Sequence, residues 1–335
     1  MAIIIYPPTI DWLWMKQRPQ QLMKQFARLG HTVYYCNKTM VRKPVEKLEP
    51  NLHLVHHHDE WLSREWPAIR SQTKEQVIVW CSFPKLFRTL HQYRPDRIIY
   101  DCVDEFPAWL PYERGMVNAA HAVVCTSERL HRRLASQYPG KPLLLARNAY
   151  DPDMGLHLPD AKHQKPADLP AGSIVGYIGA WAPWVDALLV TELARQIKGL
   201  GKVAIIGPEF GRQFGRNSDT IQFLGLKPHG SLPAYLAHLS VCIIPFLIQP
   251  ITLATNPVKA YEYLAAGKPV VSTDLPECRL LQPHVDVAKN RVEFFQMVKK
   301  RLQNPGDSAS RTRFALNETW EHRARQIAAF ISGLP

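Results

Sequence analysis

One segment places a basic and an acidic side chain on the same face of an expected helix. TNPVKAYEYLAAGKPVV (255–271) contains Lys259 and Glu262, which are three residues apart and therefore neighbours on a helix. Asn256 is a preferred N-cap, and Pro257 suits the first helical position because its missing N–H has no partner there. A helix start attracts a diphosphate through its free N–H groups, a nearby lysine adds a full charge, and a carboxylate further along can accept hydrogen bonds from ribose hydroxyls. The segment predicts a sugar-nucleotide site.

The same segment also allows a purely structural interpretation. Gly267 suits the end of a helix over about 257–266, and the apolar positions in this stretch can pack against a core. Lys259 and Glu262 would then be a surface pair. Local physics leaves both interpretations open. The packing positions are Val258, Tyr261, Tyr263 and Leu264.

Three carboxylates lie at the end of the apolar stretch RIIYD (97–101). These residues are Asp101, Asp104 and Glu105, and we expect Asp101 and Asp104 to be the catalytic candidates. A carboxylate here can act as a general base that deprotonates an acceptor hydroxyl. The structural alternative is N-capping and salt bridges to nearby arginines. Their spacing is not that of an Asp-x-Asp metal motif.

A second candidate loop is GYIGAWAPWVD (176–186), which follows an expected strand. Gly179 allows the backbone to approach a ligand closely, and Trp181, Trp184 and Asp186 would then lie beside the ligand. Alternatively, the tryptophans pack on the next helix. The loop lacks the Gly-x-Gly-x-x-Gly pattern, so it does not indicate a nicotinamide cofactor.

Polar residues after the first expected strand are candidates for the acceptor side. They are Asp11, Trp12, Arg18 and Gln21. The triplet His56-His57-His58 is a weaker candidate, because adjacent histidines in an extended segment point to opposite faces and chelate a metal poorly. We expect this triplet to be a solvated strand end.

Short apolar strands alternate with amphipathic helices along most of the chain, which is typical of a parallel sheet covered by helices on both faces. Expected strands lie at 2–6, 32–36, 52–55, 76–80, 97–101, 122–126, 143–146, 173–179, 203–207, 221–225, 241–246 and 269–273. Expected helices include 18–30, 127–139, 185–201, 232–239, 257–266 and 310–334.

The alternation stops in a stretch rich in Pro, Asp and Lys, which predicts a linker between two doubly wound domains. Ligands of such sheets bind outside the carboxyl ends of the strands, so two domains would face a cleft. The predicted parts are an acceptor-binding domain at 1–155, a linker at 156–172, a nucleotide-sugar-binding domain at 173–309 and a C-terminal helix at 310–335.

Composition limits the class of partner. The formal charge of +12 favours anionic partners, but no block of five like charges and no basic-aromatic repeat indicates nucleic acid. A phosphorylated small molecule, with an anionic membrane nearby, fits better. The most apolar stretch, 241–254, is interrupted by Pro245 and Pro250, so we expect no membrane span and a cytoplasmic protein. The positive charge adds the expectation that this protein associates with the inner face of the membrane. The six scattered cysteines are expected to be buried free thiols: Cys36, Cys81, Cys102, Cys125, Cys242 and Cys278.

The segment NPVKAYEYLAAGKPVVST resembles the sequence motif of GT-B glycosyltransferases, and in particular a family-4-like branch with enzymes of teichuronic acid and exopolysaccharide biosynthesis. The resemblance covers nearly the whole chain. The other matching segments, in the expected order, are 11–31, 98–106, 120–130, 147–151, 176–186, 205–208, 223–246 and the late Trp320 and Arg323.

The resemblance implies a GT-B fold whose last helix crosses back to the N-terminal domain. It implies a metal-independent enzyme of the hexosyltransferase type, without cofactors, which transfers a sugar from a nucleotide diphosphate, UDP rather than GDP, to a glycan or lipid-linked glycan. By the same resemblance, Lys259 is a catalytic residue that stabilises the leaving diphosphate, and Lys227 and His229 lie near the nucleobase. The donor side would comprise Gly179, Trp181, Asp186, Lys227, His229, Thr255, Asn256, Pro257, Lys259 and Glu262.

One departure keeps other functions open. The first Glu of the Glu-x7-Glu pair of retaining relatives is replaced by Ala254, so Thr252, Thr255 and Asn256 are the substitutes beside the donor sugar. A non-catalytic nucleotide-sugar-binding or assembly protein is therefore one alternative. A sugar-nucleotide epimerase is another, and it would convert donor without an acceptor.

Overall fold

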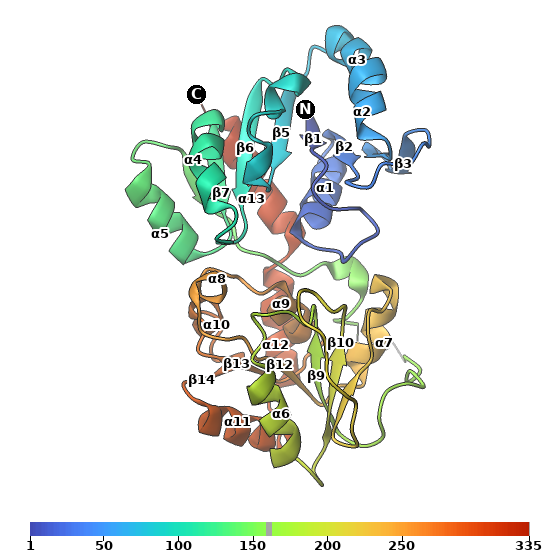
Figure 1. Ribbon diagram of the computed structural model, residues 1–335, viewed down its shortest axis with the longest axis vertical. Coiled ribbons are helices and arrows are strands. Elements are labelled where there is room, and N and C mark those ends of the chain that lie inside the picture. Colours follow the sequence, from blue (N-terminus) through green and yellow to red (C-terminus); the bar gives the residue numbers. More distant parts are fainter. Residues whose placement is uncertain (159–162, 335) are drawn as a thin grey trace. The chain divides into compact units, whose positions relative to one another are not determined.

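A computed structural model describes residues 1–158 and 163–334, and these residues form two compact units (Figure 1). Unit 1 comprises Met1–Asn148 and Trp320–Pro335, and unit 2 comprises Ala149–Thr319. Part of the predicted linker, residues 159–162, and the last residue lie outside the description. Each unit is described by itself below.

Unit 1 is built on a sheet which, in its described residues, has eight strands in the order β3-β4-β2-β1-β5-β6-β7-β8. All neighbouring pairs are parallel except the β3–β4 pair at the edge. The inner strands are buried along almost their whole length because helices cover both faces. The strands are β1 Ala2–Tyr6, β2 Thr32–Cys36, β3 Glu46–Glu49, β4 Leu52–Val55, β5 Gln76–Cys81, β6 Arg97–Cys102, β7 Ala122–Cys125 and β8 Leu143–Leu145.

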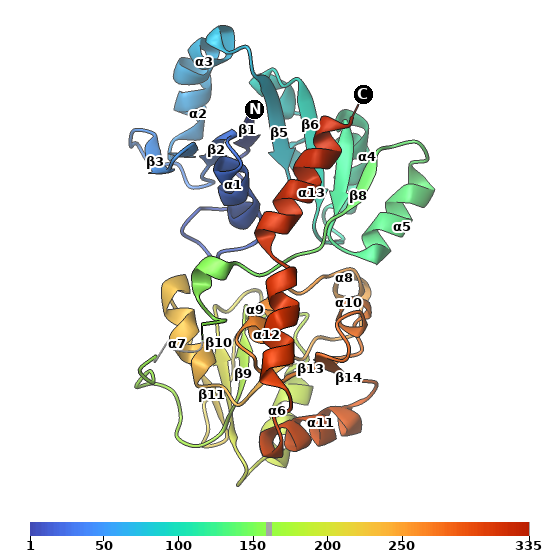
Figure 2. The same ribbon diagram turned by 180° about the vertical axis from the view of Figure 1, so that it is seen from behind.

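Helix α13, formed by a segment far away in sequence, completes the covering of unit 1. It contacts α1 and lies across one face of the sheet (Figure 2). The start of α1 has Gln17 as N-cap in a capping box with Gln20, and Pro19 lies in the first turn. The helices are α1 Arg18–Arg28, α2 His58–Glu60, α3 Trp66–Gln72, α4 Leu110–Ala119, α5 Glu128–Gln137 and α13 Trp320–Ser332, with a π-helical segment at Trp61–Glu65.

Unit 2 contains a second parallel sheet, with six strands among its described residues in the order β11-β10-β9-β12-β13-β14. Chain order reverses between β9 and β12, which in doubly wound sheets marks the ligand-binding edge. The strands are β9 Ile174–Ile178, β10 Lys202–Ile206, β11 Ile221–Phe223, β12 Val241–Ile244, β13 Val270–Thr273 and β14 Val285–Ala288. The helices are α6 Ala187–Gln196, α7 Leu232–Ala237, α8 Pro250–Leu253, α9 Val258–Ala265, α10 Pro276–Arg279, α11 Arg291–Gln303 and α12 Ser308–Asn317.

The C-terminal segment differs from the single helix predicted at 310–334. It forms α12, which packs on α9 in unit 2, and then α13 in unit 1. The break has a local cause, because the backbone after α12 bonds to another strand-like segment. The Tyr150 amide donates to the Glu318 carbonyl over 2.8 Å, and Tyr150 pairs with Thr319 in an isolated bridge. The backbone at Glu318 and Thr319 pairs with Tyr150 in an extended conformation, so it cannot continue the hydrogen-bonding pattern of α12.

Candidate functional site

Helix α9 begins one residue later than the sequence predicted. Its N-cap is Pro257 rather than Asn256, and the side chain of this proline makes no capping hydrogen bond. Asn256 is buried, and its amide nitrogen donates to the Glu277 carboxylate over 2.9 Å and to the Tyr261 hydroxyl over 3.2 Å. These two hydrogen bonds tie Asn256 to Tyr261 and Glu277 at the point where the backbone enters α9.

Lys259 lies in the first turn of α9 and extends between two aromatic rings. Its ammonium is 5.0 Å from the centre of the Tyr177 ring and 4.9 Å from that of Phe246. Such contacts stabilise a cation that has lost much of its water. Burial lowers the pKa of Lys259 from 10.5 to about 8, and the negative charge of Glu262 opposes this shift. Sequence reasoning missed both aromatic residues, although Tyr177 stands two positions before Gly179 in the candidate loop.

Gly179, the residue directly after β9, allows this position of the lysine. A Cβ atom on Gly179 would lie 2.9 Å from Cε and from Nζ of Lys259, which is too close, and its φ of +147° is rare for other residues. The glycine was predicted to permit a close approach by a ligand. The structure shows that the group already beside it is the side chain of Lys259.

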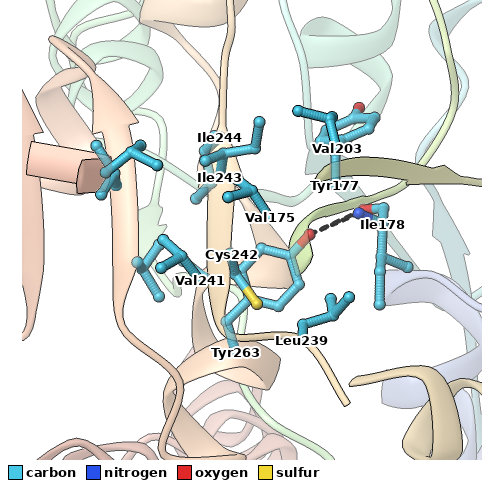
Figure 3. Close-up of a cluster of buried hydrophobic side chains, with 14 of the residues drawn as sticks. Val175, Tyr177, Ile178, Val203, Leu239, Val241, Cys242, Ile243, Ile244 and Tyr263 are labelled. Carbon is cyan, nitrogen blue, oxygen red and sulfur yellow. Dashed lines mark hydrogen bonds between the residues drawn. The ribbon is translucent and has the colours of Figure 1, made fainter. Parts of the chain in front are cut away.

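Glu262 lies one turn after Lys259 on α9, on the same face and only partly buried. It is close enough to raise the pKa of Lys259, and it contributes to the raised pKa of Tyr150, whose main cause is burial. The helix is held against β9 by Tyr263, whose hydroxyl accepts a hydrogen bond of 2.7 Å from the Ile178 amide inside the core of unit 2 (Figure 3). The orientation of the Lys259–Glu262 face is thus fixed by buried contacts.

Two of the predicted donor-side residues after β9 have structural roles. Trp181 is only 3% exposed and packs edge-on against Phe214, so it does not extend toward a ligand. Asp186 is the N-cap of α6, accepts a hydrogen bond from the Leu189 amide over 2.9 Å and forms an ion pair with Arg291. Trp184, the other tryptophan of this loop, is only partly buried and contacts the Phe210 ring. The alternative of tryptophan packing describes this loop better than the ligand interpretation.

The residues proposed as substitutes for the missing Glu are also largely engaged. The Thr252 hydroxyl is buried and bonds to the carbonyls of Leu247 and Gln249 within the first turn of α8. Thr255 is partly exposed, and its hydroxyl donates to the Ile251 carbonyl over 2.8 Å. Of this group, Thr255 is the better candidate for a contact with a donor sugar.

Lys227 forms part of a small polar cluster in unit 2. Its ammonium is 2.7 Å from the Asp168 carboxylate and lies over the Tyr235 ring, and the Tyr235 hydroxyl donates to the same carboxylate over 2.9 Å. The hydrogen bond with Asp168 raises the pKa of Lys227. His229 lies two residues further, in a 3-10 turn before α7, and is partly exposed.

In unit 1 the predicted catalytic Asp101 is fully buried at the end of β6. Its carboxylate accepts hydrogen bonds from the Arg18 guanidinium at 2.9 Å and from the Trp80 indole at 3.2 Å. Arg18 also donates to the Ala146 carbonyl over 2.9 Å and lies over the Trp320 ring. Asp101 and Arg18 thus form a buried ion pair inside unit 1, and their roles in catalysis and acceptor binding stay predictions.

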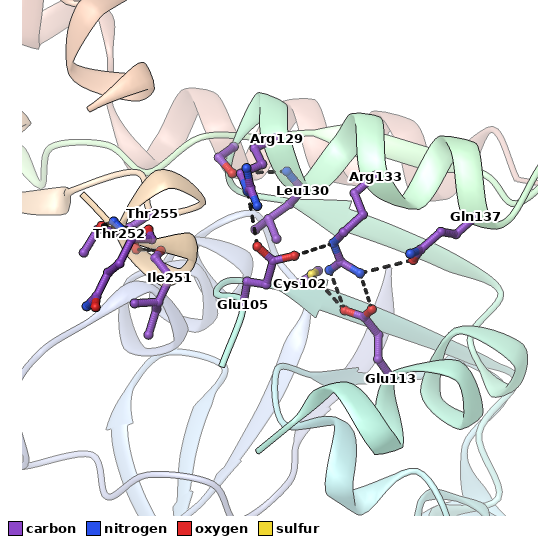
Figure 4. A network of polar contacts seen from close by, with 12 residues as sticks. Cys102, Glu105, Glu113, Arg129, Leu130, Arg133, Gln137, Ile251, Thr252 and Thr255 are labelled. Carbon is purple, nitrogen blue, oxygen red and sulfur yellow. Dashed lines mark hydrogen bonds and ion pairs between the residues drawn. The ribbon is translucent and has the colours of Figure 1, made fainter. Parts of the chain in front are cut away.

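The other carboxylates near the end of β6 divide into two groups. Glu105 forms ion pairs with Arg129 at 3.2 Å and Arg133 at 2.9 Å, and Arg133 also binds the buried Glu113 (Figure 4). This network is the salt-bridge alternative considered for the segment. Asp104 is partly exposed in the same loop. We therefore retain Asp104, and not Asp101, as the candidate base.

The remaining acceptor-side candidates are used in local structure. Gln21 is buried on α1. The Asp11 carboxylate accepts hydrogen bonds from the amide of Thr39 over 2.7 Å and from its hydroxyl over 2.6 Å. Trp12 contacts the Tyr35 ring edge-on and remains partly exposed.

The histidine triplet is more structured than a solvated strand end. His58 is buried and bonds to the Tyr93 hydroxyl over 2.6 Å, and His56 pairs with Glu46 at 2.9 Å.

Among the described residues, no group of three or more His, Cys, Asp or Glu side chains is placed to hold a metal ion. All six cysteines are buried and, within the part of the chain that the structure describes, free. In that part, no helix combines the length and apolar character needed to cross a membrane.

Comparison with known proteins follows the same division into units. Residues 172–304, which form most of unit 2, match the family described as glycosyl transferases group 1. This region is a group 1 glycosyl transferase domain. The whole chain is similar to TuaH of Bacillus subtilis, named as a teichuronic acid biosynthesis glycosyltransferase, with 23% identity over 96% of this chain and 89% of the other.

Solved structures with the same fold cover both units of this chain. Sucrose-phosphate synthase from Thermosynechococcus elongatus has a TM-score of 0.72 at 15% identity, covering 99% of this chain and 98% of the other. An alpha,alpha-trehalose-phosphate synthase (UDP-forming) from Burkholderia xenovorans, in complex with glucose-6-phosphate, has a TM-score of 0.71 at 11% identity, covering 99% and 100%. HepE from Anabaena, in complex with UDP and glucose, has a TM-score of 0.66 at 13% identity, covering 100% of both.

These comparisons confirm the predicted GT-B fold with two Rossmann-like domains and the predicted function class. The chain is a glycosyltransferase with a GT-B fold. They do not favour the non-catalytic binding protein or the epimerase. The roles of individual site residues stay predictions.

Proposed function

We propose that this glycosyltransferase transfers a sugar, of the hexose type, from UDP to a hydroxyl of a glycan or lipid-linked glycan in the synthesis of cell-surface polysaccharide. One observation carries the proposal. Lys259 holds a partly dehydrated positive charge beside Gly179, in the first turn of a helix whose N-cap is Pro257. A diphosphate fits this arrangement because its negative charges would add to that of Glu262 in stabilising the ammonium against the cost of burial.

The catalytic roles follow from where charge develops. When the sugar leaves, negative charge accumulates on the diphosphate, and Lys259 with the first N–H groups of α9 stabilises it without having to reorganise. The proposal assigns Glu262 to the ribose hydroxyls, since it lies one turn deeper on the same face. Thr255 is assigned to the donor sugar, and the segment with Lys227 and His229 to the base, with Lys227 kept in its ion pair with Asp168.

The choice of UDP rests on similar proteins. The synthase from B. xenovorans is described as UDP-forming, and HepE was solved with UDP and glucose. Because the cationic charge of Lys259 is already in place, we also propose that donor binding needs neither a metal ion nor another cofactor.

Unit 1 is proposed to hold the acceptor, with Asp104 as the general base. The similarity to TuaH, named for teichuronic acid biosynthesis, supports a glycan acceptor of the cell surface. The formal charge of +12 supports contact of the enzyme with an anionic membrane, where a lipid-linked acceptor would lie at the inner face.

The test is a thermal-unfolding panel with UDP, GDP, ADP and CMP and their common sugars, with EDTA present and absent. The proposal expects stabilisation by UDP compounds, unaffected by EDTA, and a loss of most of it in Glu262→Ala. Glu192→Ala, which removes an exposed carboxylate on α6, serves as the control. Stabilisation by another nucleotide would mean that the donor is not a UDP-sugar. Unchanged UDP affinity in Glu262→Ala would mean that another residue contacts the ribose.

A further inference from the structure

Two loops of unit 1 leave the same edge of its sheet. The first follows β1 and runs to α1, and the second follows β2 and runs to β3 (Figure 1). Strands β1 and β2 are adjacent and parallel, so their carboxyl ends, and the loops that follow, lie side by side. This is the edge at which parallel sheets of this kind bind their ligands.

Hydrogen bonds join the two loops into one surface. The Asp11 carboxylate accepts from the amide and the hydroxyl of Thr39, and the Trp12 amide donates to the Asn37 side chain over 2.8 Å. A further bond from the Trp14 amide to the Asp11 carbonyl, 3.1 Å long, closes a tight turn in the first loop. We call residues 11–16 and 37–43 the loop pair.

The loop pair exposes large apolar side chains that no core requires. Leu13 is 90% exposed and Trp14 44%, at the tip of the first loop. Met40 is 52% exposed and Val41 44%, in the second loop directly after the residue that binds Asp11. Single exposed apolar residues need no explanation, but four on two hydrogen-bonded loops form a patch, and such patches mark interaction sites.

Cations surround these apolar side chains. Lys38, Arg42 and Lys43 all lie exposed in the second loop. The one acidic residue of the loop pair is Asp11, whose carboxylate is used in binding Thr39 and lies near Lys38. The patch therefore combines apolar side chains with an excess of positive charge.

We propose that the loop pair docks onto the surface of an anionic lipid bilayer. Leucine, methionine, valine and tryptophan enter the boundary between headgroups and acyl chains, and the three cations bind lipid phosphates. Two of the three cations are lysines, which are depleted at protein interfaces but bind anionic lipid, so we take the bilayer as the occupant. A free glycan offers little apolar surface to the fully exposed Leu13. The inference rests on the proposed function, since docking by this edge brings unit 1 to lipid-linked acceptors.

The experiment measures binding of the full chain to phosphatidylcholine vesicles with and without phosphatidylglycerol, by co-sedimentation at low and high salt. The apolar variants are Leu13→Ser with Trp14→Ser, and Met40→Ser with Val41→Ser. The charge variant combines Lys38→Gln, Arg42→Gln and Lys43→Gln. Matched controls remove exposed residues of unit 2, namely Leu188→Ser with Leu280→Ser, and Arg195→Gln, Lys198→Gln and Lys300→Gln together.

The proposal expects salt-sensitive binding to the anionic vesicles, weakened about fivefold for each cation removed from the loop pair. Each apolar double variant is expected to weaken it about tenfold or more, since transfer of the apolar surface is lost. The control variants should bind like the wild type. Absence of vesicle binding by the wild type, or equal losses in loop and control variants, overturns the docking surface.

The same samples are tested for stabilisation by UDP, which reports on unit 2. Retained UDP stabilisation in the loop variants shows that unit 2 is folded, and a ligand-free melting temperature equal to that of the wild type shows that unit 1 is folded as well. A loss of vesicle binding then belongs to the loop pair. If the wild type binds vesicles but no nucleotide, the docking surface stands and the proposed transferase activity fails instead.

Discussion

Lys259→Met should stabilise the protein without ligand while abolishing donor binding. Burial lowers the pKa of Lys259 from 10.5 to about 8, which means that the folded protein holds its ammonium at a cost. Methionine has a similar length and can lie against the Tyr177 and Phe246 rings without a charge. The substitution therefore separates the effect of the charge on stability from its effect on donor binding.

The size of the effect follows from the pKa. The difference between 10.5 and about 8 corresponds to about 3 kcal/mol at neutral pH. Loss of two cation–π contacts, each worth roughly 0.5–1 kcal/mol, opposes the gain. A net gain of about 1.5 kcal/mol remains, or roughly 3–6 °C in the melting temperature of a unit of this size.

The pH dependence has a defined sign. Between pH about 8 and 10.5 the unfolded chain keeps the proton of Lys259 while the folded protein has released it, so wild-type stability rises with pH in this window. The advantage of Lys259→Met is therefore largest below pH about 8 and disappears toward pH 10.5.

Thermal unfolding with and without UDP, at neutral and at alkaline pH, measures both quantities. Lys268→Met is the control, because burial lowers the pKa of Lys268 as well but its ammonium donates to the Ala237 carbonyl over 2.7 Å. The control should keep UDP stabilisation and should not gain stability. A Lys259→Met protein that is less stable than wild type at neutral pH, or that still binds UDP as tightly, refutes the reasoning.

Three further predictions concern residues at or just after the carboxyl ends of strands β9 and β6. Gly179→Ala should lower the free energy of unfolding by about 1–3 kcal/mol and weaken UDP binding. The reason is that the added Cβ would lie 2.9 Å from Lys259 and that φ at this position is +147°. Unfolding and UDP titration test this against Gly215→Ala, whose added Cβ would have no non-neighbouring atom within 4 Å. Asp101→Asn should cost about 3–5 kcal/mol in denaturant unfolding, because it leaves a buried arginine without its countercharge. Asp104→Asn should slow transfer about 10²–10⁴-fold, and equal transfer rates in Asp104→Asn and wild type would remove Asp104 as the base.

The sequence predicted most of the strands because parallel strands buried on both faces are continuous apolar runs. Stretches such as 2–6 and 32–36 correspond to β1 and β2 residue for residue. The edge strand β3 was missed, since its four residues EKLE are mostly polar and its pairing with β4 is set by tertiary structure. The two C-terminal helices were merged for a similar reason, because a partner distant in sequence, Tyr150, interrupts the helix.

Site residues were harder to predict because polar residue type does not reveal burial. Asp101 and Arg18 stand 83 positions apart, and neither sequence neighbourhood indicates that they neutralise each other inside unit 1. Trp181 and Asp186 have the residue types of ligand contacts, but one fills a core and the other caps a helix. The loop pair was overlooked in part because Asp11 and Trp12 were considered without the exposed Leu13 beside them.

Helix α9 shows why two opposed interpretations of one segment can both hold. Tyr261, Tyr263 and Leu264 face the core, and Tyr263 fixes the helix to the backbone of β9. The other face carries Lys259 and Glu262, and the packing of the helix therefore sets where these two side chains begin. A packed helix is what allows a lysine to stay at Gly179 against the cost of burial, since a mobile segment would return the ammonium to water. The packing interpretation is thus a condition of the diphosphate interpretation, and a substitution such as Tyr263→Phe, which removes the hydroxyl bonded to Ile178, should loosen α9 before it affects any ligand.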